Sequence, residues 1–382
     1  MQYPQSLVLW LFFISFVSCQ NENEMRKVAD YTIEWDNETI VCIADNGFYP
    51  RMRRINDNSL LTFYENGKGD VVFKRSIDEG ATWSESNVAY KSFVYANQDQ
   101  SSKVNIANPE IIQLENNDLI LACNLRPAKD GIYPFSIAIK RSTDNGHTWE
   151  PEQIIYKAHN RFRDGCWEPS FLELPDGTLQ IYFANEFPYT ESDEQEISMI
   201  SSSDNGHTWT QDAKTVSFRK GYRDGMPVAV LDGEEIAIVI EDNGFEQFKP
   251  YIIKGNINDN WANYITGTSE NRKSALTDPL PNNVYAGAPY LIKTDDNLFV
   301  LSYQTTENRT DDWERSTMEV AISNTTSNFK NPSQPFKVPL NKEAKWNSLT
   351  DLGDGEIAAL STTNFRSDNI GIWMIKGQII NK

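Results

Sequence analysis

Apolar and polar positions alternate along this chain in short runs, and helical periodicity is absent over any long stretch. A turn rich in Asp, Asn or Gly separates two apolar runs at six places, with a period of about 60 residues. Six hairpins at an even spacing predict an all-β chain folded as a six-bladed β-propeller, with four strands in each blade. The turns are residues 56–59, 116–118, 175–178, 232–234, 295–297 and 353–355.

A second repeat marks the ends of three hairpins. The pattern SxDxGxTW, known as the Asp-box, occurs at residues 76–83, 142–149 and 202–209. Its Ser and Asp side chains can bind the backbone amides of a tight turn, its Gly supplies a positive φ, and its Trp can pack beneath the blade. We therefore expect these residues, including His147 and His207, to stabilise turns and to take no part in catalysis.

The N-terminal segment predicts export. Residues 7–17 form an apolar run that is too short to span a bilayer and that ends just before Cys19. The sequence predicts a signal peptide over residues 1–18 and a lipid-anchored tether and lead-in over 19–36, with Cys19 as the acylated residue. The protein would then be an outer-membrane or cell-surface lipoprotein. An ordinary secretory signal, giving a periplasmic or secreted protein, is the alternative; fatty-acid labelling that survives Cys19→Ala would contradict acylation.

The rest of the chain, residues 37–382, contains no linker and predicts one propeller domain, which we expect to be monomeric. The formal net charge of −19 argues against nucleic acid as a partner, because phosphate would be repelled. Cys42, Cys123 and Cys166 show no CxxC spacing, and two of the three histidines lie in Asp-boxes. No metal or other cofactor is expected. The aromatic content of 12% suits stacking on sugar rings.

The hairpin register gathers polar residues on one face of the disc. The first strand of each hairpin begins, and the second ends, on the face opposite the turns, so both sets of residues would surround the axis. The strand starts carry Arg51, Asn108, Glu110, Glu168, Met226, Tyr290 and Asn347. The strand ends carry Glu65, Arg126, Glu186, Glu241 and Tyr303.

Two of these carboxylates suit the hydrolysis of a glycosidic bond, which needs one protonated and one ionised carboxyl group. Glu168 lies between Trp167 and Pro169, where loss of solvent would raise its pKa. Glu241 directly follows the apolar run 236–240. The alternative is a structural ion pair with an arginine such as Arg163 or Arg223.

Around these residues the sequence resembles the Asp-box propeller glycosidases of the sialidase superfamily, and most of all glycoside hydrolase family 93, the exo-acting arabinanases. The resemblance covers nearly the whole chain after the leader and runs through Tyr-Pro-Arg at 49–51, Trp-Glu-Pro at 167–169 and Ala-Pro-Tyr at 288–290. It implies a retaining, exo-acting enzyme for arabinan-type or related glycans, with Glu168 as acid/base and Glu241 as nucleophile. It also implies that the sugar pocket is lined by Arg51, Asn108, Arg126, Glu186, Tyr290, Tyr303 and Trp346.

Two other functions stay open. An exo-α-sialidase would hold a sugar carboxylate with three arginines and attack with a tyrosine, for which Tyr303 is the candidate. Glu241 stands where such an enzyme would need an arginine, and it would repel the substrate. A surface lipoprotein that binds glycans without cutting them is the other alternative, because a fold does not determine its function.

Overall fold

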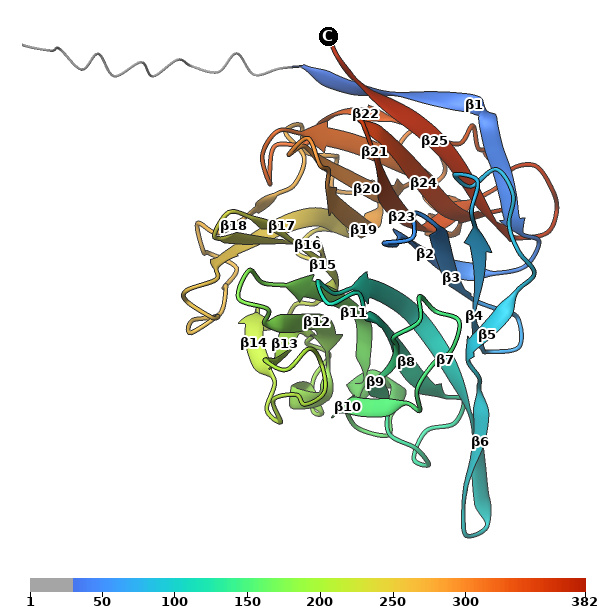
Figure 1. Cartoon of the computed structure of the whole chain (residues 1–382). Helices are drawn as coiled ribbons and strands as arrows, with labels where there is room; N and C mark the ends of the chain where they lie inside the picture. The colour runs from blue at the N-terminus through green and yellow to red at the C-terminus, as the bar shows by residue number, and fades with distance from the viewer. Residues whose placement is uncertain (1–29) are drawn as a thin grey trace, which may run out of the picture.

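The computed structural model describes residues 30–382. Six antiparallel sheets surround a central axis, which confirms the predicted six-bladed β-propeller (Figure 1). The predicted signal peptide and Cys19 lie outside the described residues. Within residues 30–382 no helix is both long and apolar enough to cross a membrane.

Each blade is built from strands that follow one another outward from the axis. The innermost strands are β2 (Phe48–Arg54), β7 (Gln100–Gln113), β11 (Cys166–Glu173), β15 (Asp224–Asp232), β19 (Ala286–Lys293) and β23 (Ala344–Gly353). The second strands are β3 (Leu60–Glu65), β8 (Leu119–Pro127), β12 (Leu179–Asn185), β16 (Glu235–Asp242), β20 (Phe299–Thr305) and β24 (Glu356–Thr363). The third strands are β4 (Val71–Ser76), β9 (Ser136–Ser142), β13 (Glu196–Ser202), β17 (Lys249–Asn256), β21 (Thr317–Ser323) and β25 (Gly371–Asn381). The outermost strands are β5 (Asn87–Tyr90), β10 (Gln153–Lys157), β14 (Lys214–Ser217), β18 (Arg272–Ser274), β22 (Lys330–Ser333) and β1 (Tyr31–Ala44).

The second blade departs from the four-strand plan because it has a fifth strand, β6 (Phe93–Asn97), which pairs with the first residues of β7. The hairpin that β6 and β7 form projects from the edge of the disc (Figure 1). The six-hairpin period does not predict it, because the hairpin lies in a connection between blades.

The two ends of the described chain close the ring. Strand β1 pairs with β25, so the last blade takes three strands from the C-terminal part and its outermost strand from the N-terminal part. The propeller therefore begins at Tyr31, and the boundary predicted at residue 37 is too late. Alternating polar residues such as Glu34 and Asp36, exposed on an outermost strand, made this segment resemble a tether.

The Asp-boxes form the predicted turns. In the second box Ser142 Oγ accepts a hydrogen bond from Gly146 N at 2.8 Å, and Asp144 Oδ1 accepts one from Thr148 N at 2.8 Å. Hydrogen bonds from Thr148 lower the pKa of Asp144 to about 2. Because these carboxylates are already bound within their turns, they stabilise hairpin ends at the face away from the site described below.

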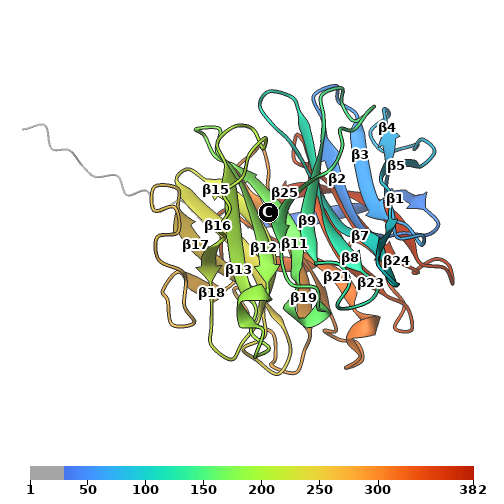
Figure 2. The same cartoon turned by 90° about the horizontal axis from the view of Figure 1, so that it is seen from below.

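Strands run through the thickness of the disc, and the connections lie on its two faces (Figure 2). Three short 3-10 helices belong to these connections, namely η1 (Phe162–Asp164), η2 (Phe187–Tyr189) and η3 (Trp313–Arg315). Apolar side chains from neighbouring sheets pack between the blades, and the strand residues there are almost fully buried. This packing fixes the inner strand ends around the axis.

Candidate active site

All six innermost strands contain the same backbone irregularity. One residue, near the start of five strands and in the middle of β7, has a positive φ between 45° and 55°, and a break in the strand register follows it. Proline follows this residue in five blades, and Asn347 follows it in the sixth. Such bulges redirect a side chain out of the regular alternation of a strand. The six residues are Tyr49, Asn108, Glu168, Met226, Ala288 and Trp346.

The second strand of the preceding blade supports five of the six bulges. In five blades a side chain there accepts the backbone N–H of the bulge residue, which would otherwise lack a ladder partner. The donor and acceptor pairs are Tyr49 with Thr362 at 3.1 Å, Asn108 with Glu65 at 2.8 Å, Glu168 with Asn124 at 2.9 Å, Ala288 with Glu241 at 2.9 Å and Trp346 with Gln304 at 2.9 Å. Glu65 and Glu241 therefore occupy the same position in the repeat, and each fixes a neighbouring blade.

A pocket of about 430 Å³ opens where these bulges meet. Its walls carry aromatic rings, four carboxylates and two guanidinium groups. The lining residues are Phe48, Tyr49, Glu65, Asn108, Arg126, Phe162, Trp167, Glu168, Glu186, Gln195, Arg223, Glu241, Phe248 and Trp346. Because these residues come from five blades, the pocket is enclosed on its sides.

Glu168 is the carboxyl group best suited to hold a proton. Burial raises its pKa to about 8, and the negative charge of Glu241 adds to this effect, while Arg126 opposes it. Two carboxylates that share one pocket cannot both ionise cheaply, so one of them keeps its proton at neutral pH. Glu168 is therefore protonated in the resting protein and can act as an acid.

Glu241 is the second buried carboxyl group of the pocket. Burial raises its pKa as well, although the Ala288 amide and the charge of Arg223 oppose this rise. Two glycines flank its carboxylate: a Cβ on Gly225 would lie 3.1 Å from Glu241 Oε1, and one on Gly287 would lie 2.9 Å from Oε2. The space for this side chain exists because both neighbours lack a Cβ.

Glu186 organises one wall of the pocket. Its Oε2 accepts a hydrogen bond from Trp167 Nε1 at 2.8 Å, and its Oε1 forms an ion pair with Arg223. Arg223 thus pairs with Glu186, and neither Glu168 nor Glu241 takes part in an ion pair within residues 30–382. Glu186 positions the ring of Trp167, the residue before Glu168.

The guanidinium group of Arg126 is positioned to bind a ligand in the pocket. It lies over the rings of Trp167 and Phe162, with centroid distances of 5.3 and 5.9 Å. Within the described chain it donates no hydrogen bond, so its donors remain available to sugar hydroxyl groups. Asn108 Oδ1 is a buried acceptor that likewise has no hydrogen-bond partner among the described residues.

Six of the nine residues that the sequence predicted for the site line this pocket together. They are Asn108, Arg126, Glu168, Glu186, Glu241 and Trp346. The other three lie elsewhere. Arg51 is buried beneath the pocket, where its Nε is 3.0 Å from Glu110 Oε2 and its guanidinium lies over the ring of Tyr290. Tyr303 is buried within its blade, and its hydroxyl donates to Glu319 Oε2 at 3.0 Å.

Sequence reasoning did not single out as pocket-lining several of the residues found there. Phe48 and Tyr49 come from the first bulge, Phe162 from η1, Gln195 from the loop before β13, and Phe248 from the loop before β17. The X-Pro pair that recurs in five of the six blades could have identified Tyr49, because it marks the bulge. The loop residues have no repeat signal. No cluster of three or more His, Cys, Asp or Glu side chains suited to a metal occurs within residues 30–382.

Comparisons with known proteins agree with this architecture. A family model described as a BNR repeat-like domain matches residues 135–234. No curated protein matches the sequence significantly. Among solved structures, the GH93 α-L-arabinofuranosidase of Fusarium graminearum with arabinobiose is similar with a TM-score of 0.65 at 15% identity, over 90% of this chain and 97% of that one.

Two further solved structures are similar to this chain in fold. The Penicillium chrysogenum α-L-arabinanase with arabinobiose has a TM-score of 0.65 at 17% identity, over 92% of this chain and 98% of that one. The NanB sialidase of Streptococcus pneumoniae has a TM-score of 0.61 at 12% identity, over 92% of this chain and 70% of that one. At these identities the comparisons show a shared fold.

Proposed function

We propose that the protein is a glycoside hydrolase in which Glu168 is the acid and Glu241 the second carboxylate. One observation carries this proposal: Glu168 and Glu241 line one pocket, and burial together with the charge of Glu241 raises the pKa of Glu168 to about 8. A glycosidase needs a protonated and an ionised carboxyl group on either side of the scissile bond. The solved relatives with arabinobiose support a sugar as the ligand.

The proposed reaction has two steps. Glu168 gives its proton to the leaving oxygen while Glu241 attacks the anomeric carbon, so the glycosidic bond breaks as a glycosyl ester forms. Glu168, now ionised, then removes a proton from water, which displaces Glu241 and returns both groups to their starting states. This sequence retains the anomeric configuration. Walls from five blades favour a chain end over a chain interior, so we propose exo action.

The charge of the pocket favours a neutral sugar. Four carboxyl groups line it, of which Glu168 holds a proton, together with two guanidinium groups, and Arg51 is already paired with Glu110 beneath it. A sialidase mechanism would need a third arginine at the sugar and a tyrosine nucleophile in the pocket, whereas Tyr303 lies outside the lining. We therefore propose a neutral glycan, of the arabinan type, as the substrate class.

The test is turnover on aryl glycosides and arabinan with three variants. Glu241→Gln should lose activity on every substrate. Glu168→Gln should lose the natural linkages but still release an activated phenol in a first burst, because such a leaving group needs little protonation. Tyr303→Phe is the matched control, since it removes one hydroxyl outside the pocket, and should keep its rate within a few-fold.

Three outcomes would contradict the proposal. Near wild-type rates in both glutamate variants would show that other groups carry out the reaction. Efficient release of sialic acid that disappears in Tyr303→Phe would favour the sialidase alternative. Sugar binding without turnover of any glycoside would favour a glycan-binding protein.

A further inference from the structure

The fourth blade carries a charged pair where the others do not. One position beyond Glu241, Asp242 on β16 lies opposite Asp224 on β15. Both side chains are buried, with 2% and 1% of their surface exposed. The equivalent pairs in four other blades are uncharged: Ile106 with Leu125, Cys166 with Asn185, Ala286 with Thr305 and Ala344 with Thr363. Two carboxylates facing each other across a strand pair repel and need compensation.

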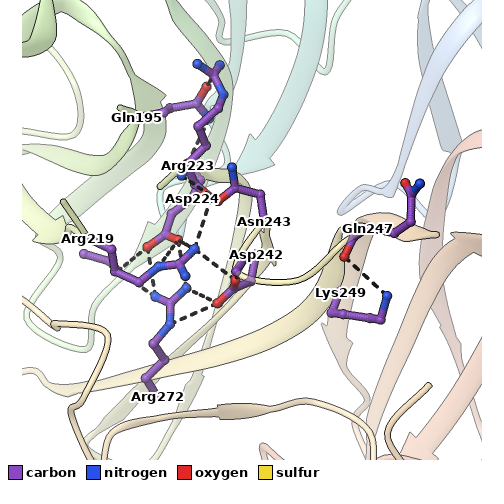
Figure 3. A network of polar contacts seen from close by, with 11 residues as sticks. Gln195, Arg219, Arg223, Asp224, Asp242, Asn243, Gln247, Lys249 and Arg272 are labelled. Atoms are coloured by element: carbon purple, nitrogen blue, oxygen red, sulfur yellow. Dashed lines mark hydrogen bonds and ion pairs between the residues drawn. The ribbon is translucent and has the colours of Figure 1, made fainter. Parts of the chain in front are cut away.

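Two arginines supply that compensation (Figure 3). Arg272 on β18 donates to Asp224 at 2.8 and 2.7 Å and to Asp242 at 3.1 Å. Arg219, from the loop that follows β14, lies 2.7 Å from Asp224 and 2.9 Å from Asp242. Two positive and two negative charges are therefore matched, and each carboxylate bridges both arginines. We call these four residues the Asp–Arg cluster.

The Asp–Arg cluster is attached to the two strand ends that form the surroundings of Glu241. Asp242 is the next residue along β16, and Asp224 precedes Gly225, whose missing Cβ leaves room for the Glu241 carboxylate. The amide of Gln195 also donates to the Asp224 carbonyl at 2.8 Å, which ties this strand end to the third blade. Side chains alternate along a strand, so Asp242 holds the backbone from the side opposite Glu241.

We propose that Asp242, held by Arg219 and Arg272, is a positioning residue for Glu241. This inference rests on the proposed function, because it assigns Asp242 a role in the same reaction. Asp242 itself does not line the pocket. It fixes the backbone from which Glu241 reaches both the sugar and the Ala288 amide. A displacement of about 1 Å at a reacting group can lower a rate about a hundredfold.

The test compares Asp242→Asn with Asp118→Asn in the full chain. Both changes remove one charge from an ion pair, and the Asp118–Arg141 pair, at 2.6 Å, lies at the turn between β7 and β8 on the opposite face. For Asp242→Asn we expect kcat to fall about ten- to a hundredfold with KM within threefold. For Asp118→Asn we expect both constants to stay within twofold. If Asp242 had a purely structural role, kcat would change by the same factor in both variants when each is assayed at the same interval below its own melting temperature.

A second measurement does not depend on activity. Glu241 Oε2 accepts the Ala288 N–H at 2.9 Å, so hydrogen exchange at Ala288 reports where Glu241 lies. Exchange there should rise about tenfold in Asp242→Asn and stay unchanged in Asp118→Asn. If the wild type cleaves no glycoside, the proposed function fails while this exchange still decides the positioning role. Unchanged exchange at Ala288, or a kcat within twofold of wild type, overturns the inference.

Should Asp242→Asn fail to fold, Arg219→Lys gives the same answer with a milder change. It keeps the charge but loses the planar fork that reaches both carboxylates. The same two measurements then apply, with the same direction expected for kcat and for exchange at Ala288. No change in either measurement overturns the inference.

Discussion

Glu168 owes its role to its backbone as much as to its carboxyl group. It adopts a positive φ of 50°, a conformation that costs a residue with a Cβ about 1–2 kcal/mol. Asn124 offsets part of this cost by accepting the Glu168 N–H, and the bulge turns the carboxyl group into the pocket. The backbone leaves Glu168 little freedom to move away from Glu241, so the burial and the repulsion that raise its pKa are both built into the fold.

This arrangement predicts a pH-dependent effect of Glu168→Gln on stability. The pKa of Glu168 rises from its usual 4.5 in the unfolded chain to about 8 in the folded protein. Between these values the unfolded chain loses a proton that the folded protein keeps, so the wild type loses stability as pH rises from about 4.5 to 8. Glutamine cannot ionise and avoids this loss. The melting temperature of Glu168→Gln minus that of the wild type should therefore increase over this pH range and level off above it.

Thermal unfolding in a pH series measures that difference. The exposed residue Glu85 provides the control, because Glu85→Gln should shift the melting temperature by a similar small amount at every pH. A constant difference between Glu168→Gln and the wild type would show that Glu168 is ionised in the folded protein. It could not then be the acid.

The bulges of the innermost strands explain which site residues the sequence could identify. Turns at an even period gave the hairpins and the face of the site correctly, because Asp, Asn and Gly mark turns directly. A bulge adds one residue to a strand without changing the hydrophobic period, and each one-residue shift turns a side chain to the other side. Arg51 lies beyond its bulge and is buried below the pocket for this reason. Tyr303 lies on β20, which has no bulge, but the longer turn before β20 places Gln304 and not Tyr303 at the position of Glu241, so Tyr303 points away from the pocket.

The glycines beside Glu241 yield a prediction about strand ends. Gly225 has no positive φ, so alanine there is compatible with the backbone, but its Cβ would lie 2.9 Å from Gln195 Nε2 and 3.1 Å from Glu241 Oε1. Gly225→Ala should displace the carboxylate and lower kcat/KM at least tenfold, with a modest loss of stability. Steady-state kinetics on an aryl glycoside measures the change.

Gly255→Ala is the control for this prediction. It lies on β17, where a Cβ would crowd the ring of Trp261 at 2.5 Å, and it does not line the pocket. It should lower the melting temperature at least as much as Gly225→Ala while kcat/KM stays near the wild-type value. If kcat/KM fell equally in the two variants, the loss would come from lower stability of the whole protein and not from displacement of Glu241.

At the scale of the whole molecule, the pocket differs from a symmetric one because equivalent positions in the six blades carry different residues. Pairing of β1 with β25 closes the disc, and every innermost strand contributes a bulge residue. Repetition alone would give a uniform pocket. The proposed site lies where blades depart from the pattern: Glu168 is at a bulge that elsewhere carries uncharged residues, and Glu241, like Glu65, stands where other blades have Asn124, Gln304 or Thr362. A repeat in the sequence therefore predicts the fold, and departures from the repeat indicate the site.

The charge of the whole molecule predicts how salt will affect the choice of substrate. The chain carries a net charge of −19, and with Glu168 protonated its pocket holds three carboxylates against two guanidinium groups. An anionic glycoside approaches against this field, and salt screens the repulsion over about 10 Å at an ionic strength near 0.1 M. Raising the salt concentration should therefore increase kcat/KM for an aryl sialoside or uronide, if these are cleaved at all, and leave it unchanged for an aryl arabinofuranoside.

Kinetics at low and high ionic strength and neutral pH measure this contrast, with the neutral arabinofuranoside as the internal control for salt effects on the protein. The opposite result, a loss of kcat/KM with salt for the anionic glycoside alone, would mean that Arg126 and Arg223 dominate the field at the pocket. Their cations would then recruit a sugar carboxylate despite the acidic surface. In that case the sugar would be an acid, and the neutral-glycan assignment would have to be replaced by the sialidase alternative.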